Sequence, residues 1–230
     1  MRRVWLALLL ACSPRDKVEV PILNYHSVGE AASNYVVPVA AFEQQLDWLA
    51  GEGFRTISLH ELAESRAGRA VLPRRAVILT FDDGRSDALS VVLPLLRKRG
   101  MSGTFFIITG RVGEPGFLNW EEVRALAAAG MEIGSHTQTH PRLPDLADEA
   151  AEEELKVSKA RLEKEIGRPV EVLAYPYNAV RSHTASLAAA AGYRVAVAGT
   201  AHGRWDLLRL RRFPVNGFTS LSSIQQMSVH

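Results

Sequence analysis

Cysteine is almost absent from this sequence. Its 230 residues include one cysteine, Cys12, so neither an intramolecular disulfide framework nor a zinc site built from several cysteines can form. The sequence also has no long charged run of one sign and no low-complexity tract, which argues against a disordered tail. It contains no Gly-x-Ser-x-Gly motif, so serine catalysis lacks its usual sequence signature. A chain of this length without linkers or internal repeats is expected to form one domain with a sizeable core.

A basic excess is missing as well. The formal net charge is +2 at pH 7, and Arg2 and Arg3 carry both extra charges in a segment without acidic residues. The remainder of the chain is therefore neutral. Nucleic-acid-binding proteins normally carry a clear positive excess, so we expect no nucleic-acid partner.

The first residues have the pattern of an export signal. Arg2 and Arg3 precede an apolar stretch over residues 4–11, which is too short to cross a hydrocarbon core of about 30 Å but is typical of a signal peptide. The run Leu9-Leu10-Ala11-Cys12 resembles a bacterial lipobox, in which the cysteine becomes the lipidated first residue. We predict a signal peptide over 1–11, a short tether over 12–17 and a folded domain over 18–230. The protein would be exported to the cell envelope and held at the membrane only by a lipid anchor at Cys12; an ordinary secretory leader and a buried N-terminal strand are the alternatives.

Short apolar runs alternate with amphipathic helical patterns along the domain. The expected strands cover residues 18–25, 55–59, 75–81, 103–109, 131–135, 170–174, 193–198 and 207–215. The expected helices cover residues 40–50, 60–66, 86–99 with a break near Pro94, 120–129, 148–166 and a segment around 186–191. Apolar strands separated by helices indicate a parallel sheet covered on its faces. The fold class is therefore α/β, and a single-domain distorted (β/α) barrel of about seven units fits better than an open sheet. The acidic face of the helix over 148–166 is interpreted as a solvated surface.

Four expected strands end in polar residues. These ends read Asn24-Tyr25-His26-Ser27, Thr80-Phe81-Asp82-Asp83-Gly84, Ser135-His136-Thr137-Gln138-Thr139-His140-Pro141 and Tyr175-Pro176-Tyr177-Asn178. In parallel α/β folds, functional groups collect where the strands end. One aspartate with two imidazoles would give a divalent metal three ligands and leave a position open, and the adjacent aspartate could act as a base. No thiolate is present, so zinc or a similar first-row ion is plausible without being selected.

Two of these runs carry a specific resemblance. The Thr-Phe-Asp-Asp-Gly and Ser-His-Thr-x-Thr-His-Pro runs resemble the first two motifs of the polysaccharide deacetylases, the NodB-homology group known as carbohydrate esterase family 4. The resemblance covers roughly residues 18–217. The opening Pro21-Ile22-Leu23-Asn24-Tyr25-His26-Ser27-Val28 is similar to the branch whose late motifs are permuted to the N-terminus, as in poly-N-acetylglucosamine deacetylases of biofilms.

The resemblance implies a role for each polar strand end. By position, the general base is Asp82, the metal ligands are Asp83, His136 and His140, the catalytic acid is His26, and the backbone N–H of Tyr177 binds the oxyanion. The implied cofactor is a divalent metal ion, zinc before cobalt or nickel. The implied activity of the domain over 18–230 is hydrolysis of N-acetyl groups from a glycan that contains N-acetylglucosamine. Peptidoglycan, poly-N-acetylglucosamine and a chitin-like polymer stay open as substrates, and the sequence indicates no particular protein partner.

The sequence departs from the family pattern in two places. Ala174 occupies the position where the third motif usually has an arginine that steadies the base, and Arg85 follows Asp-Asp-Gly where an aromatic residue is common. Our hypothesis is that Arg212, from the last expected strand, approaches Asp82 in place of the missing arginine. The alternatives to a deacetylase are a catalytically silent, surface-anchored glycan-binding protein and another metallohydrolase, such as a phosphoesterase.

Aromatic and histidine residues outside these motifs are assigned more simply. An aromatic ring can stack on the apolar face of a sugar, and the candidates are Trp48, Trp120, Tyr177 and Trp205. The remaining histidines, His60, His183 and His202, are interpreted as non-catalytic.

Overall fold

A computed structural model describes residues 19–199 and 206–228 of the chain. The predicted signal peptide, the tether, the lipid anchor at Cys12, and the residues His202 and Trp205 lie outside these ranges. No helix within the ranges is long and apolar enough to cross a membrane.

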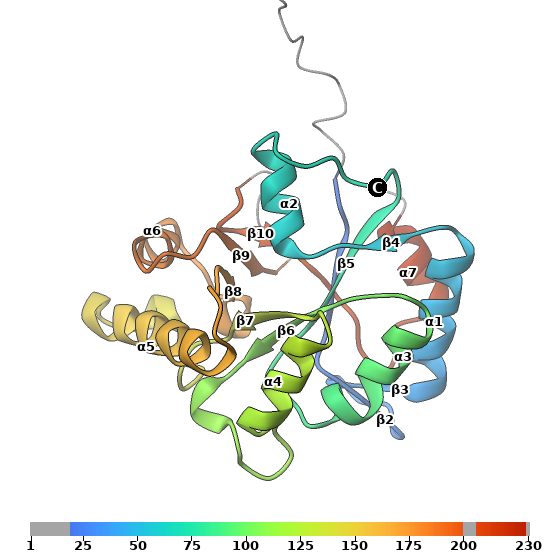
Figure 1. The fold of residues 1–230 in the computed structure, drawn as a ribbon, viewed down its shortest axis with the longest axis horizontal. Coiled ribbons are helices and arrows are strands. Elements are labelled where there is room, and N and C mark those ends of the chain that lie inside the picture. Colours follow the sequence, from blue (N-terminus) through green and yellow to red (C-terminus); the bar gives the residue numbers. More distant parts are fainter. Residues whose placement is uncertain (1–18, 200–205, 229–230) are drawn as a thin grey trace, which may run out of the picture.

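One parallel sheet of nine strands curves into a nearly closed barrel (Figure 1). Its strands follow the order β10-β9-β8-β7-β6-β5-β1-β11, with β4 beside β5. Their bounds are β1 Ile22–Tyr25, β4 Arg55–Thr56, β5 Ala76–Phe81, β6 Thr104–Ile107, β7 Glu132–Ser135, β8 Val172–Ala174, β9 Val195–Ala198, β10 Leu210–Arg211 and β11 Phe213–Pro214. The predicted fold class is confirmed, although most strands are shorter than the apolar runs that predicted them.

The last predicted strand closes the barrel. Its first half, β10, pairs with β9, and its second half, β11, pairs with β1. Arg212 alone separates the two halves, and its N–H donates to the carbonyl of Ala198 at 3.0 Å. The two ends of the sheet therefore meet on one short segment with an arginine at its centre.

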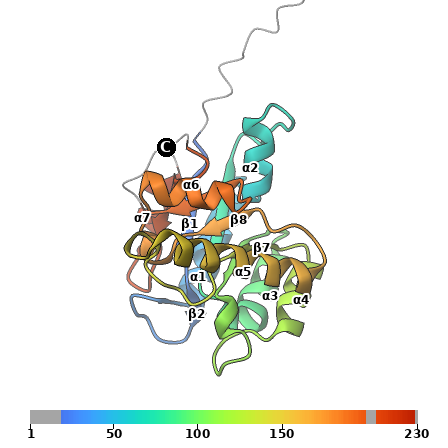
Figure 2. The same cartoon turned by 90° about the vertical axis from the view of Figure 1, so that its left-hand side faces the viewer.

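Helices cover the outside of the barrel, except α2, which packs at the end where the strands begin (Figures 1 and 2). They are α1 Val39–Gly51, α2 Leu59–Arg66, α3 Leu93–Lys98, α4 Trp120–Ala128, α5 Asp148–Ile166, α6 Ser182–Ala190 and α7 Leu221–Ser228. A π-helical segment, Ala88–Val92, leads into α3 at Pro94, where the sequence predicts a break. Proline has no N–H to continue an α-helical hydrogen-bond ladder, and the wider π turn accommodates it.

The sequence did not predict α7 or a small ribbon at the mouth of the barrel. The ribbon pairs β2, Ser27–Gly29, with β3, Val36–Pro38. Strands of three residues are too short to show a hydrophobic period, so they cannot be predicted from the alternation of apolar and polar residues.

Strand side chains alternate between the two faces of the sheet. Leu23, Leu79 and Phe105 pack in the apolar cluster shared with the outer helices. Their neighbours Ile22, Ile78 and Phe106 belong to a second cluster, which also contains residues of β8, β9, β10 and α2. Side chains two residues apart share a face, so the inward rows continue to Asn24 and Thr80 and, past the end of β5, to Asp82. The barrel interior is thus apolar where the strands begin and polar where they end.

Candidate active site

All six predicted site residues lie at the edge where the strands end. Asp82 and Asp83 follow β5, His136 and His140 follow β7, His26 follows β1, and Tyr177 follows β8. This placement results from topology, because parallel strands bring their carboxyl ends to one edge of the sheet.

Asp83, His136 and His140 form a group that could hold a metal ion. One ligand atom from each lies within 4.8 Å of the others. The two imidazole Nε2 atoms are 3.2 Å apart, and they lie 3.6 and 3.8 Å from Oδ1 of Asp83. Bonds of about 2.0–2.1 Å at tetrahedral angles place two nitrogen ligands roughly 3.3 Å apart. The donor types and their spacing therefore fit zinc or a related divalent ion.

A backbone carbonyl fixes the tautomer of His136. Nδ1 of His136 lies 2.7 Å from the carbonyl oxygen of Ala174, and a carbonyl oxygen can only accept a hydrogen bond. Nδ1 therefore carries the proton, which leaves the lone pair of Nε2 facing Asp83 and His140. Ala174 lacks the expected arginine side chain, yet its backbone still orients a candidate ligand.

Both imidazoles are poised in the form that binds metals. Burial lowers the pKa of His136. Burial and the neighbouring His136 lower the pKa of His140 to about 4. Each ring is consequently neutral at pH 7 and offers a lone pair instead of a positive charge.

The backbone at these positions is strained. Asp83, His140 and Tyr177 have φ angles of 75°, 65° and 57°, in the left-handed region that residues with a side chain rarely adopt. Such conformations persist only where surrounding contacts hold them, and they cluster at functional sites.

Asp82 is held by three hydrogen bonds inside the barrel. Nη1 and Nη2 of Arg212 donate to its two oxygens at 2.7 and 2.8 Å, and Nδ2 of Asn24 donates to Oδ2 at 2.9 Å. Arg212 is only 1% exposed, and it also donates to the side chains of Thr80 and Asn178. The predicted approach of Arg212 to Asp82 is therefore present in the structure.

This pairing decides the charge of Asp82. Burial works to raise the pKa of the carboxyl, but the Arg212 cation, helped by His136 and His26, outweighs burial and holds the pKa below the ordinary carboxyl range. Asp82 is thus ionised at neutral pH although it is almost inaccessible to solvent. Neither Asn24 nor Thr80 was assigned a role from the sequence; the inward alternation of β1 and β5 was the signal that could have identified them.

Glu154 of α5 holds the loop between the two histidines. Its Oε2 accepts hydrogen bonds from the N–H groups of Gln138 and Thr139 at 2.9 and 2.8 Å. Gly110 lies against the same loop, where a Cβ would come within 2.6 Å of the Gln138 carbonyl oxygen. The expectation that the acidic side of α5 is only a solvated surface is wrong at Glu154, because its carboxylate accepts hydrogen bonds from two backbone N–H groups of this loop.

His26 and Tyr177 border the group from two sides. His26 lies near enough to lower the pKa of His140 as well as that of Asp82. The ring of Tyr177 lies 4.8 Å from that of His140 and is 63% exposed. In contrast, Trp48 packs on Phe54 and Trp120 lies under the guanidinium of Arg161, so neither reaches the candidate site.

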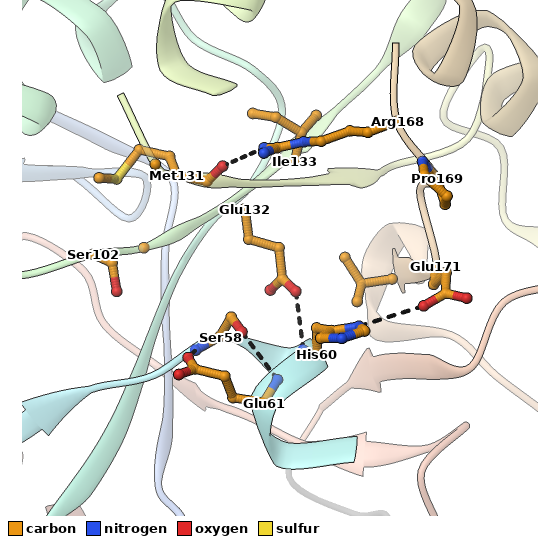
Figure 3. Close-up of a pocket in the computed structure, with 13 residues that line it drawn as sticks. Ser58, His60, Glu61, Ser102, Met131, Glu132, Ile133, Arg168, Pro169 and Glu171 are labelled. Atoms are coloured by element: carbon orange, nitrogen blue, oxygen red, sulfur yellow. Dashed lines mark hydrogen bonds and ion pairs between the residues drawn. The ribbon is translucent and has the colours of Figure 1, made fainter. Parts of the chain in front are cut away.

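A cavity of about 370 Å³ lies at the opposite edge of the barrel, where β6, β7 and β8 begin (Figure 3). Glu132 points into it and accepts hydrogen bonds from the N–H groups of Leu59 and His60. Burial raises the pKa of Glu132. His60 faces Glu171 at 3.4 Å. These polar groups hydrogen-bond within the cavity and cap α2, and the cavity is distinct from the candidate site at the strand ends.

Comparisons with known proteins agree with this geometry. Residues 69–196 match the family model described as polysaccharide deacetylase. The chain is 29% identical to YxkH of Bacillus subtilis over 202 residues, which is 85% of this chain and 72% of that protein. It is 28% identical to the poly-beta-1,6-N-acetyl-D-glucosamine N-deacetylase of Staphylococcus aureus over 185 residues, 67% of this chain and 63% of the relative. The solved structure of the Streptococcus pyogenes deacetylase PplD in complex with acetate superposes with a TM-score of 0.87 at 27% identity, covering 93% of this chain and 99% of the other.

The Glu154 contacts lead to a first prediction. Replacing Glu154 by alanine frees the His136–His140 loop without removing a ligand, so zinc affinity should fall by roughly 10- to 100-fold, as for other residues that orient ligands. Competition with a chromophoric chelator measures this. Glu152→Ala, which removes an exposed carboxylate paired with Lys156 on the same helix, should leave the affinity unchanged. Equal affinities for the two variants would show that the loop is held without Glu154.

The buried ion pair leads to a second prediction. Arg212→Met leaves the Asp82 carboxylate without its charge partner, and the free energy of unfolding should drop by about 3–5 kcal/mol. Adding Asp82→Asn should restore part of this loss, and urea denaturation of the four proteins measures the coupling. Because the pKa of Asp82 is lowered by folding, the coupling should be present at pH 7 and decline below about pH 4. If the effects of Arg212→Met and Asp82→Asn on the free energy of unfolding were additive at pH 7, the proposed coupling of the two residues would be contradicted.

Proposed function

The chain belongs to the polysaccharide deacetylase family, and from this premise we propose that it hydrolyses N-acetyl groups of an N-acetylglucosamine-containing polysaccharide with the help of a divalent metal. The observation that carries the proposal is an ionised, buried Asp82 beside a group of one carboxylate and two neutral imidazoles. The predicted lipid anchor at Cys12 would keep this activity at the cell envelope.

Asp83, His136 and His140 would hold the metal, and zinc fits their donor set, with cobalt or nickel as substitutes. The chemistry that such an ion supplies is polarisation of the acetamide carbonyl and acidification of the attacking water. Asn24 and Arg212 keep the Asp82 carboxylate from turning away from this centre.

Asp82 is the general base in this proposal. As the water oxygen forms its bond to the acetyl carbon, the carboxylate takes up a proton from that water. The bidentate contact with Arg212 fixes the carboxylate plane, which places its proton-accepting lone pair in advance of the reaction. The same contact weakens Asp82 as a base, so its contribution depends on the water being made more acidic.

His26 and Tyr177 complete the reaction. Protonated His26 gives its proton to the amide nitrogen as the carbon–nitrogen bond breaks, because an amine leaves poorly without one. The backbone N–H of Tyr177 donates a hydrogen bond to the negative oxygen that develops on the carbonyl. The products are acetate and a free amino group on the sugar.

A third prediction tests the reaction itself. Residues 13–230 should release acetate from N-acetylglucosamine oligomers or from peptidoglycan, lose this activity on chelation and regain it with zinc or cobalt. Asp82→Asn should abolish turnover, whereas Asp47→Asn, the same change at an exposed aspartate of α1 that pairs with Arg99, should not affect it. Metal-restored release that Asp82→Asn does not reduce would overturn the assignment of the base, and no release from any glycan would overturn the function.

A fourth prediction concerns pH. The base must be ionised and the acid protonated. Because the pKa of Asp82 is held below the ordinary carboxyl range, its acidic limb lies below about pH 4, and kcat/KM should fall only on the alkaline side, where the acid is no longer protonated. His26→Gln removes the acid, which should lower turnover by about 10²- to 10⁴-fold and flatten the alkaline side. Initial rates between about pH 5 and pH 9 with saturating zinc measure the curve. A wild-type profile without an alkaline decline across this interval would count against His26 as the acid.

A further inference from the structure

Two exposed tyrosines stand against imidazoles of the candidate site. Tyr35 is 66% exposed, and its ring centre lies 5.3 Å from that of His26 at an interplanar angle of 77°. Tyr177 is 63% exposed and lies 4.8 Å from His140. Among the described residues only five large apolar side chains are strongly exposed, namely Tyr35, Val71, Val157, Tyr177 and Phe218. Because surface apolar groups usually scatter singly, two of five at one centre indicate a binding surface.

The segment that carries Tyr35 is rigidly held. Oγ of Ser33 accepts hydrogen bonds from the N–H groups of Tyr35 and Val36, and the Tyr35 carbonyl accepts from the N–H of Ser27 at 2.9 Å. Gly217 docks so closely that a Cβ would lie 2.4 Å from the Val36 carbonyl oxygen. The exposed ring is therefore presented at low entropic cost, which favours binding by a preorganised surface.

A carboxylate fixes the segment from the other side. Oδ2 of Asp87 accepts the N–H of Val28 at 2.8 Å, two residues after His26. The candidate acid His26 directly precedes β2 and Tyr35 directly precedes β3, so the same anchored ribbon positions both residues. A ligand that packs on Tyr35 is placed directly beside His26.

The two tyrosines approach the centre from separate parts of the barrel. Tyr35 belongs to the ribbon that follows β1, and Tyr177 follows β8, with β5, β6 and β7 between these strands in the sheet. Asp82 and the candidate metal ligands come from β5 and β7. In the order of the sheet, the strand ends that carry Asp82 and the candidate metal ligands therefore lie between the two tyrosines.

We propose that Tyr35 is a sugar-binding residue that packs on the pyranose next to the one being deacetylated, while Tyr177 contacts the glycan on the opposite side. The apolar face of a pyranose packs on an aromatic ring as other apolar surfaces do. The substrate is then a glycan chain in which a sugar beside the reacting one contacts Tyr35, and free N-acetylglucosamine, which has no neighbouring sugar, is a poor substrate. This inference rests on the proposed deacetylase function, whose substrate class it narrows.

The test compares oligomers of two to five N-acetylglucosamine units. With wild type, kcat/KM for acetate release should rise with chain length. Tyr35→Ala should lower kcat/KM for the pentamer on the order of tenfold, mainly through KM, and should affect the dimer less. Tyr35→Phe, which keeps the ring, should retain the length dependence. Val71→Ala is the control, because it removes an apolar side chain at a 91% exposed position remote from the site. It should leave kcat/KM unchanged for every oligomer.

Direct binding separates this inference from the function on which it rests. Calorimetric titration of the pentamer into Asp82→Asn, with and without Tyr35→Ala, needs no turnover. Weaker binding on loss of Tyr35 would support the sugar contact even if no acetate were released, in which case the hydrolytic function alone would fail. If Tyr35→Ala changed neither the chain-length dependence of acetate release nor the affinity for the pentamer, the proposed sugar contact would be overturned. The hydrolytic function would still stand in that case, because acetate is released.

Discussion

The buried ion pair between Arg212 and Asp82 is the interaction on which the site depends. A carboxylate that is 3% exposed would lose its charge to burial, and with it any use as a base, unless a cation accompanied it. The cation comes from the only residue that separates β10 from β11. The segment that joins the two ends of the sheet therefore also neutralises the charge at the centre of the barrel. The same residues close the fold and complete the site.

Around this pair the barrel is built in layers. Apolar side chains from the strands and α2 fill the end where the strands begin, and they leave the polar end free of competing solvent. Gly134 leaves room for Phe106, whose ring would lie 2.5 Å from a Cβ at position 134, and this ring packs below both Arg212 and His136. The arginine that pairs with the candidate base and a candidate metal ligand consequently pack on the same aromatic ring. A shift of Phe106 would move both groups together.

Sequence reasoning reached the parts of the molecule that follow from period and topology. Alternating strands and helices predicted the barrel, and polar strand ends predicted the location of Asp82, His136 and His140. Contacts between residues far apart in the sequence could mostly not be predicted. Glu154 lies on a helix whose sequence is that of an ordinary acidic surface helix. Tyr35 lies beside a ribbon of three-residue strands, which have no recognisable pattern. Arg212 was the exception. Two adjacent arginines at the end of an apolar strand are costly to bury, so a buried one requires an acidic partner.

The position of Ala174 shows that the charge partner of Asp82 can come from a strand other than β8. Ala174 is buried at the end of β8, and its carbonyl orients His136 without help from its side chain. What Asp82 requires is a guanidinium in the plane of its carboxylate, and any inward position of the polar layer can deliver one. Arg212 enters from the closing strand and is further held by Asn178, just beyond the end of β8. The guanidinium thus comes from the closing strand and contacts the turn after β8, so an alanine at position 174 does not by itself indicate loss of catalysis.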